Sequence, residues 1–108
     1  MASDVLVVLS TFPPGEASAV AARTLVEEKL AACVNLVPGV RSIYVWDGRL
    51  EESIETLAVI KTTSDRFEAM RARLLELHPA QVPEVVAVEV LDGHLEYLGW
   101  VRHAVRPE

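Results

Sequence analysis

The sequence lacks the residues and motifs on which several kinds of site depend. One cysteine in 108 residues excludes an intrachain disulfide framework and any zinc finger built on cysteine pairs. The HExxH, CxxC, GxGxxG and P-loop motifs are all missing, so the chemistry that each of them carries is not indicated. No nucleophile stands in a recognisable spacing with a base, and we therefore expect a protein that is not an enzyme.

Positive charge and long apolar runs are also scarce. Ten Lys and Arg residues against 16 Asp and Glu residues leave a net charge of −6 with histidine neutral. This balance argues against nucleic acid and anionic membranes as partners. The early run Val5–Leu9 is far shorter than the roughly 20 residues of a membrane helix, and it lacks the preceding Lys or Arg of a signal peptide. We expect a cytoplasmic protein whose lone thiol, Cys33, stays reduced.

What the chain has in abundance is apolar side chains, at 51% of all residues. A chain of this length fits one domain, here residues 1–108, and can bury a core without disulfides or a structural metal. The apolar fraction lies slightly above the roughly 45–50% that is usual for soluble domains. The excess over a small independent domain needs an explanation.

Hydrophobic periodicity predicts the order strand, helix, strand, strand, helix, strand, followed by a terminal helix. The expected segments are Val5–Leu9, Ala17–Leu30, Cys33–Trp46, Arg49–Thr62, Phe67–Leu77, Val85–Val90 and His94–Val105. This order is the split βαβ pattern. We therefore predict an α+β fold, a ferredoxin-like βαββαβ sandwich with a long central hairpin and a short C-terminal helix.

Local signals fix the turns of this prediction. Asp47-Gly48 is typical of a type I′ turn, which needs positive φ at both central residues. Pro38-Gly39 predicts a bend or bulge within the preceding strand. Ser64-Asp65, with Glu68 three residues after the aspartate, fits a capping box at the start of the second helix. In the return strand, Thr56–Ile60 is mostly apolar, so we expect the second half of that strand to be the better buried one.

A set of short motifs, specific in combination and in order, resembles the CutA divalent-cation tolerance family over nearly the whole chain. These motifs are LVEEKLAACVN at Leu25–Asn35, Pro38-Gly39, Ser42-Ile43-Tyr44, Trp46, Gly48, Glu51-Glu52, Lys61-Thr62-Thr63, Glu76-Leu77-His78-Pro79, Val82-Pro83-Glu84 and Tyr97-Leu98-Gly99-Trp100. The chain is identified as a member of this family on that resemblance.

The resemblance implies a non-enzymatic, cytoplasmic homotrimer that responds to divalent metal ions and binds copper or another divalent cation. It implies a ferredoxin-like subunit whose hairpin reaches its neighbours. The architecture is also similar to that of the trimeric PII signalling proteins, which bind small ligands between subunits. The alternative function is therefore a small-ligand sensor or signalling scaffold with sites at the intersubunit clefts.

Two residues are candidate metal ligands. Cys33 offers a soft thiolate, although its position among small apolar residues favours a packing role. His78 ends the second helix, where the macrodipole favours a cationic imidazole, and its position favours a role in capping the helix end over metal binding. The copper sites proposed for the family draw on a thiol at the end of the first strand and a histidine pair before a proline. Here those positions hold Ser10 and Leu77, so His78 alone remains of that set.

Charged residues around the central hairpin are candidates for a cleft that binds a small anionic ligand. Lys61 follows an apolar strand, and we expect its ammonium near the sheet edge. There it could pair with a carboxylate across a subunit interface, bind an anionic ligand, or form a structural ion pair. Glu84, fixed between Pro83 and a buried strand, is a carboxylate that could receive Lys61. The candidate hard ligands or acid/base groups are Glu51, Glu52, Glu55 and Glu84, although glutamates in a hairpin usually form a solvated face.

The aromatic residues of the hairpin, Tyr44 and Trp46, complete the candidate cleft. Aromatic rings bury much area and keep a polar handle, which favours an interface role over a ligand box. The family usually has a tyrosine directly after the His-Pro pair, but here Ala80 occupies that place. If that ring lines the cleft in relatives, the cleft of this protein is wider and less aromatic.

Overall fold

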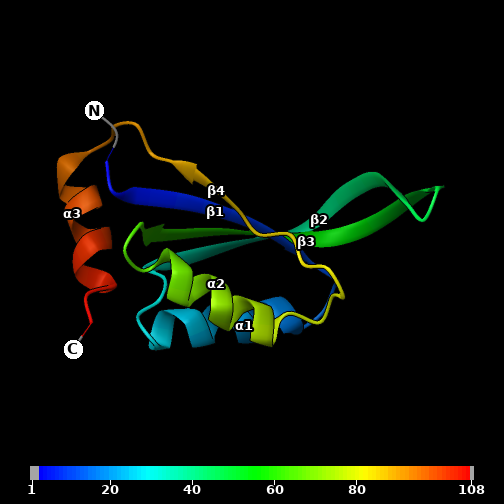
Figure 1. The fold of residues 1–108 in the computed structure, drawn as a ribbon, viewed down its shortest axis with the longest axis horizontal. Helices are drawn as coiled ribbons and strands as arrows, with labels where there is room; N and C mark the ends of the chain where they lie inside the picture. The colour runs from blue at the N-terminus through cyan, green and yellow to red at the C-terminus, as the bar shows by residue number, and fades with distance from the viewer. Residues whose placement is uncertain (1–2, 108) are drawn as a thin grey trace.

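The computed structural model describes residues 3–107 and places four strands and three helices within them (Figure 1). They are β1 (Val5–Phe12), α1 (Ala17–Glu27), β2 (Cys33–Trp46), β3 (Arg49–Thr63), α2 (Phe67–Leu77), β4 (Val86–Glu89) and α3 (Leu95–Ala104). The predicted α+β class is confirmed. Across residues 3–107, none of the helices has the length and apolar character needed to cross a membrane.

The strands form one sheet in the order β2-β3-β1-β4, and every neighbouring pair is antiparallel. Helices α1 and α2 lie side by side on one face of this sheet (Figure 1). Successive residues of a strand point to opposite faces, so alternate residues of β1 face these helices. The core that they share includes Leu6, Val8, Phe12, Leu25, Met70 and Leu74.

Helix α3 packs at one end of the sheet, in a second and smaller apolar cluster (Figure 1). Val5, which points away from the α1–α2 core, joins Leu98 and Val101 there. In residues 3–107 no element covers the rest of this face, which we call the open face. Val7 and Leu9 are half-buried on it, and at the β4 edge Val88 remains 54% exposed.

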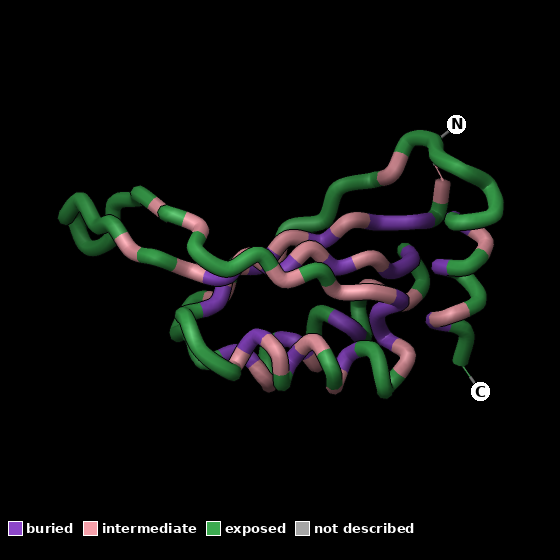
Figure 2. Tube along the Cα trace, turned by 180° about the vertical axis from the view of Figure 1, so that it is seen from behind, coloured by how far each residue is buried: buried purple, intermediate pink, exposed green. Residues whose placement is uncertain are grey.

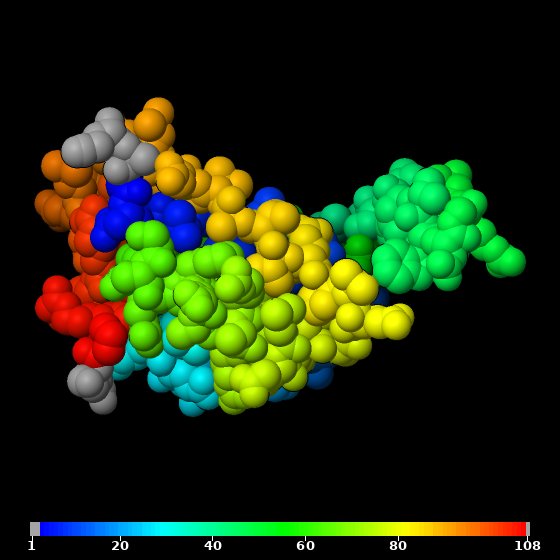
Figure 3. Space-filling view, viewed as in Figure 1, coloured from blue at the N-terminus to red at the C-terminus, as the bar shows by residue number. Residues whose placement is uncertain are grey.

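The distal parts of β2 and β3 form a hairpin that projects beyond the body of the molecule, and we call it the arm (Figures 1 and 3). Its residues are mostly exposed, whereas the second half of β3 is largely buried, as the sequence predicted (Figure 2). The arm ends at Asp47 and Gly48, whose φ angles of 52° and 73° confirm the predicted turn with positive φ.

A β-bulge separates the arm from the body of the sheet, as Pro38-Gly39 predicted. Val37 pairs with Leu57 and Val40 pairs with Glu55, so two residues of β2 stand opposite one residue of β3. Gly39 takes a φ of 76° in this bulge, which glycine adopts without steric cost. A bulge of this kind bends the strand and increases its local twist.

Several predicted boundaries differ from the structure. Strand β1 continues to Phe12 rather than ending at Leu9, because β3 supplies pairing partners along its whole length. Helix α1 ends at Glu27 rather than Leu30, since Lys29 turns into the left-handed region with a φ of 59°. Strand β4 is shorter by one residue at each end than the predicted Val85–Val90, and α3 is shorter in the same way than the predicted His94–Val105.

The predicted capping box at the second helix is wrong. Arg66 occupies the N-cap position of α2, and its side chain makes no capping hydrogen bond. Asp65 instead accepts a hydrogen bond from the Thr63 hydroxyl. Because α2 begins with Arg66 as its N-cap, Glu68 stands at N2 and not at the N3 position that the reciprocal bond of a capping box requires.

Candidate functional site

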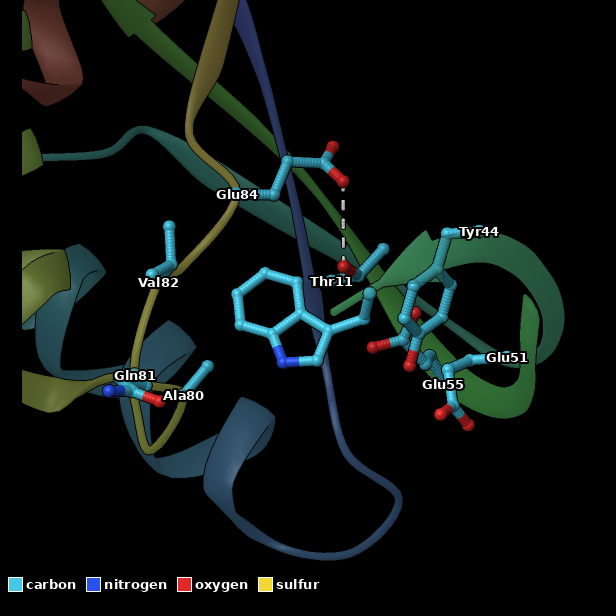
Figure 4. A pocket seen from close by; sticks show the side chains of 9 residues that line it. Thr11, Tyr44, Glu51, Glu55, Ala80, Gln81, Val82 and Glu84 are labelled. Carbon is cyan, nitrogen blue, oxygen red and sulfur yellow. Dashed lines mark hydrogen bonds between the residues drawn. The ribbon is translucent and has the colours of Figure 1, made fainter. Parts of the chain in front are cut away.

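A cavity of about 500 Å³ lies between the arm and the loop that joins α2 to β4 (Figures 3 and 4). This volume falls within the roughly 300–1,000 Å³ of small-molecule sites. The arm side is lined by Tyr44, Trp46, Glu51 and Glu55, and the body side by Thr11, Ala80, Gln81, Val82 and Glu84. The two sides come from segments far apart in the sequence.

The bulge explains why aromatic rings face this cavity. Paired residues of antiparallel strands share a face. In the body, odd-numbered β2 residues such as Cys33 pair with odd-numbered β3 residues of the open face. Beyond the bulge, the even-numbered Tyr44 pairs with Glu51, and Trp46 pairs with Arg49. If side chains alternated without interruption from Cys33, Tyr44 and Trp46 would point to the face that the helices cover. The extra residue of the bulge shifts the alternation by one, so both rings point to the other face.

Three carboxylates line the cavity. Glu51 and Glu55 come from β3, and Glu84 comes from the loop before β4 (Figure 4). Glu84 accepts a hydrogen bond of 3.5 Å from the Thr11 hydroxyl. Within residues 3–107, the side chains of Glu51 and Glu55 take part in no hydrogen bond or ion pair. The cavity is therefore a site of uncompensated negative charge.

Glu52 lies elsewhere and is compensated. It follows Glu51 on β3 and so points to the other face of the arm. There it pairs with Arg41 through contacts of 2.7 and 2.8 Å. The predicted cleft role of Glu52 therefore does not fit its position within one subunit, whereas Glu51 and Glu55 do face the cavity.

His78 is buried behind the cavity wall and has both ring nitrogens occupied. The backbone N–H of Ala80 donates to Nδ1 over 3.1 Å, so Nε2 is the nitrogen that donates to the Thr11 carbonyl, over 2.8 Å. The ring also stacks on Phe12, with centroids 4.1 Å apart. Within one subunit this arrangement leaves neither nitrogen free for the metal-ligand role predicted for His78, and the ring bridges two chain segments instead of capping the helix end.

Cys33 and Lys61 lie together on the open face, away from the cavity. They are direct cross-strand partners, and the Lys61 ammonium donates a hydrogen bond to Asn35. Cys33 is half-buried rather than fully packed. Lys61 belongs to an interior strand and so does not lie at a sheet edge as predicted. Lys61 pairs with Val7 of β1. Thr11, which lines the cavity, is four residues further along β1, or about 13 Å from Val7.

Lys61 and Glu84 therefore do not meet within one subunit, because Glu84 lies beside Thr11. Nor do the two candidate metal ligands meet. His78 stacks on Phe12 in the α1–α2 core, and Cys33 lies on the opposite face. In the part of the chain that the structure describes, no three His, Cys, Asp or Glu side chains are grouped so that they could hold a metal ion. Ser10, at the family's thiol position, is fully buried.

Thr11, Gln81 and Val82 line the cavity but were not predicted as site residues. Thr11 lies beyond the predicted end of the first strand at Leu9. It reaches the cavity because β1 continues to Phe12. Gln81 and Val82 belong to an irregular loop between two prolines. The motif Val82-Pro83-Glu84, which contributes to the family resemblance, was the available signal for this wall.

The fold and the cavity together define a small α+β sandwich domain with a projecting hairpin over a ligand-sized, acidic and aromatic cavity. The chain belongs to the CutA1 divalent ion tolerance protein family, whose model matches residues 6–104. This match covers the body, the arm and α3, and it confirms the family identified from the sequence motifs.

Individual relatives agree with this assignment. The divalent-cation tolerance protein CutA of Thermus thermophilus is 49% identical over 96 residues, which are 89% of this chain and 93% of that protein. The crystal structure of CutA from Xylella fastidiosa superimposes with a TM-score of 0.94 at 40% identity, covering 96% of this chain and all of that one. CutA from Archaeoglobus fulgidus, described as a periplasmic divalent cation tolerance protein, gives 0.90 at 31% identity, covering 94% of this chain and 99% of that one.

Proposed function

We propose that this protein acts in divalent-cation tolerance as a non-enzymatic homotrimer in the cytoplasm. The family supports the role in cation tolerance. The strand order β2-β3-β1-β4 supports a ferredoxin-like description of the subunit. Because the Archaeoglobus relative is described as periplasmic, cell fractionation with an antibody against this chain is the direct check of its compartment.

Uncovered apolar surface is the observation that carries the proposed assembly. On the arm face opposite the cavity, Ile43, Val45 and Leu50 are 61%, 67% and 76% exposed. The open face adds a second apolar area around Val86 and Val88. Contiguous apolar patches of this kind mark interaction sites. Two such patches on different parts of one subunit suit a closed ring, in which each copy meets two neighbours.

The assembly is tested by light scattering, which is expected to give about three times the subunit mass of 11.9 kDa. Val88→Glu places a charge on the open face and is expected to release monomers. Leu75→Glu is the matched control, because Leu75 is exposed on α2, on the other side of the sheet. A monomeric wild-type chain, or trimers in Val88→Glu, would contradict the proposed interface.

In this proposal a metal ion, copper or another divalent cation, is held by ligands pooled between subunits. The half-buried Cys33 thiol on the open face is the soft donor that suits copper. Equilibrium dialysis of wild type and Cys33→Ser against Cu(I), Cu(II) and Zn(II) tests this role. Binding that weakens in Cys33→Ser supports it, and the absence of binding below about 1 mM at pH 7 contradicts it.

The cavity favours a second function, a PII-like sensor of a small ligand. Its volume and its mixture of rings and carboxylates are those of a small-molecule site. In the proposed trimer the arm reaches a neighbouring subunit, so the cavity would open toward an intersubunit cleft. A ligand that binds the folded protein raises its melting temperature. A panel of small metabolites that leaves the melting temperature unchanged would remove this second function.

A further inference from the structure

We propose that the cavity under the arm binds a small organic cation, a compound with an alkylammonium or quaternary ammonium group. This inference rests on the second function above, that of a small-ligand sensor, and it specifies the ligand class. It replaces the anionic ligand expected from the sequence, because the basic residue of that expectation, Lys61, is outside the cavity.

The charge of the lining residues is the first argument. The described lining contains three glutamates and no Lys, Arg or His residue. Arg49 lies on the same face of the arm, next to the tip, but does not line the cavity. Arg41, the other basic residue of the arm, is paired with Glu52 on the opposite face. An anion entering the cavity would meet only like charge, whereas a cation would gain from Glu51, Glu55 and Glu84.

The aromatic rings are the second argument. Tyr44 and Trp46 line the arm side of the cavity. Among the described residues, the Tyr44 hydroxyl forms a hydrogen bond only with the Ser53 hydroxyl, at 3.4 Å. The faces of such rings attract ammonium groups, and a cage of rings is the usual way in which proteins recognise quaternary ammonium compounds. Rings and carboxylates on one wall suit a cation that is partly apolar.

A bare metal ion fits the cavity less well than an organic cation. Its three glutamates come from two strand positions of the arm and from the opposite loop, and in residues 3–107 no three such side chains converge on one point. A metal ion needs several oxygen ligands within about 2.6 Å. An organic cation several ångströms long can instead contact the ring wall and carboxylates on both sides.

The test uses choline, 1,4-diaminobutane, 3,3-dimethylbutanol and inorganic phosphate as probes, measured by calorimetry on the full-length chain at pH 7. Dimethylbutanol has the shape of choline without its charge. We expect choline and diaminobutane to bind with a dissociation constant below about 1 mM, and the neutral alcohol and phosphate not to bind. Glu55→Gln and Trp46→Leu are each expected to weaken cation binding about tenfold, which corresponds to about 1.4 kcal/mol.

Glu52→Gln is the matched control, because Glu52 lies on the same strand but on the opposite face of the arm. It is expected to leave the affinity for cations unchanged. Equal binding of choline and its neutral isostere, or equal loss in Glu52→Gln and Glu55→Gln, would overturn the cation proposal. Binding of phosphate without the cations would overturn it while leaving a ligand sensor in place. If no probe and no member of the metabolite panel binds, both proposals fail.

Discussion

At the residue scale, His78 shows how the position of a side chain can be predicted while its partners are missed. The sequence placed it at the end of α2, and it is there. Its burial depends on Phe12 and Thr11, which the sequence did not place beside it because β1 was predicted to end too early. A histidine with one accepting and one donating nitrogen ties the end of β1 to the loop that lines the cavity.

His78→Phe is expected to lower the free energy of unfolding by about 2 kcal/mol, because the buried ring loses its hydrogen bonds to the backbone of Thr11 and Ala80. The new ring can still stack on Phe12, so the loss reports the polar contacts. Urea denaturation measures it. His103→Phe, at an exposed position of α3, is the control and is expected to change stability little. Equal effects of the two substitutions would contradict the bridging role.

The hydroxyl groups of Ser10 and Thr62 are both fully buried but differ in their hydrogen bonding. Thr62 donates to the Leu30 carbonyl over 2.7 Å, whereas Ser10 Oγ has no hydrogen-bond partner among the described residues. Ser10→Ala is expected to raise the free energy of unfolding by about 1 kcal/mol, since it removes an unsatisfied polar group. Thr62→Val is expected to lower it by a similar amount. Chemical denaturation of both variants distinguishes the two cases, and a loss in Ser10→Ala would show a hidden partner.

At the scale of the elements, the sequence predicted every helix and strand and erred mainly at their ends. Periodicity reports which face of a segment is apolar, but it cannot show where tertiary pairing extends a strand. Strand β1 gained three residues from its pairing with β3. The bulge was predicted from Pro38-Gly39, yet its effect on Tyr44 and Trp46 depends on pairing on both sides of it.

Deletion of Gly39 is expected to restore one-to-one pairing between β2 and β3 and so to remove the bend at the base of the arm. The arm then leans differently over the cavity, and the Trp46 indole becomes more solvated. In a Trp100→Phe background, the fluorescence emission is expected to move to longer wavelength while the far-ultraviolet circular dichroism is retained.

Gly39→Ala is the matched comparison for this deletion. It keeps the bulge but forces an alanine into the left-handed region, at a cost of about 1 kcal/mol in stability. Its emission is expected to stay that of the Trp100→Phe parent. Identical spectra for the deletion and this variant would show that the bulge does not position the arm.

At the scale of the whole molecule, the subunit extends over 44 × 28 × 22 Å, and its long axis runs along the arm (Figure 1). The 51% apolar content is divided between a core under two helices and exposed residues of the arm and the open face. The composition indicated an excess of apolar residues. Which surfaces expose these residues depends on strand order and twist, and a sequence pattern does not determine either of them.

If the subunits assemble as proposed, stability depends on concentration. The melting temperature is expected to rise as the protein is concentrated over about a hundredfold range, because dissociation accompanies unfolding by mass action. Val88→Glu, at the exposed β4 position, is expected to lose this dependence. Differential scanning calorimetry at several concentrations measures it, and a constant melting temperature in the wild type would speak for a subunit that is stable alone.

The bulge and the type I′ turn together make the arm an element whose length can change only in fixed steps. Adding two residues to each strand between bulge and turn would lengthen the arm by about 7 Å and keep Tyr44 and Trp46 on their present side. Adding one residue to each strand would turn Trp46 to the apolar face of the arm, opposite the cavity. Val45 would then point toward the cavity and its glutamates. Natural insertions in this hairpin are therefore expected to arrive in multiples of four residues.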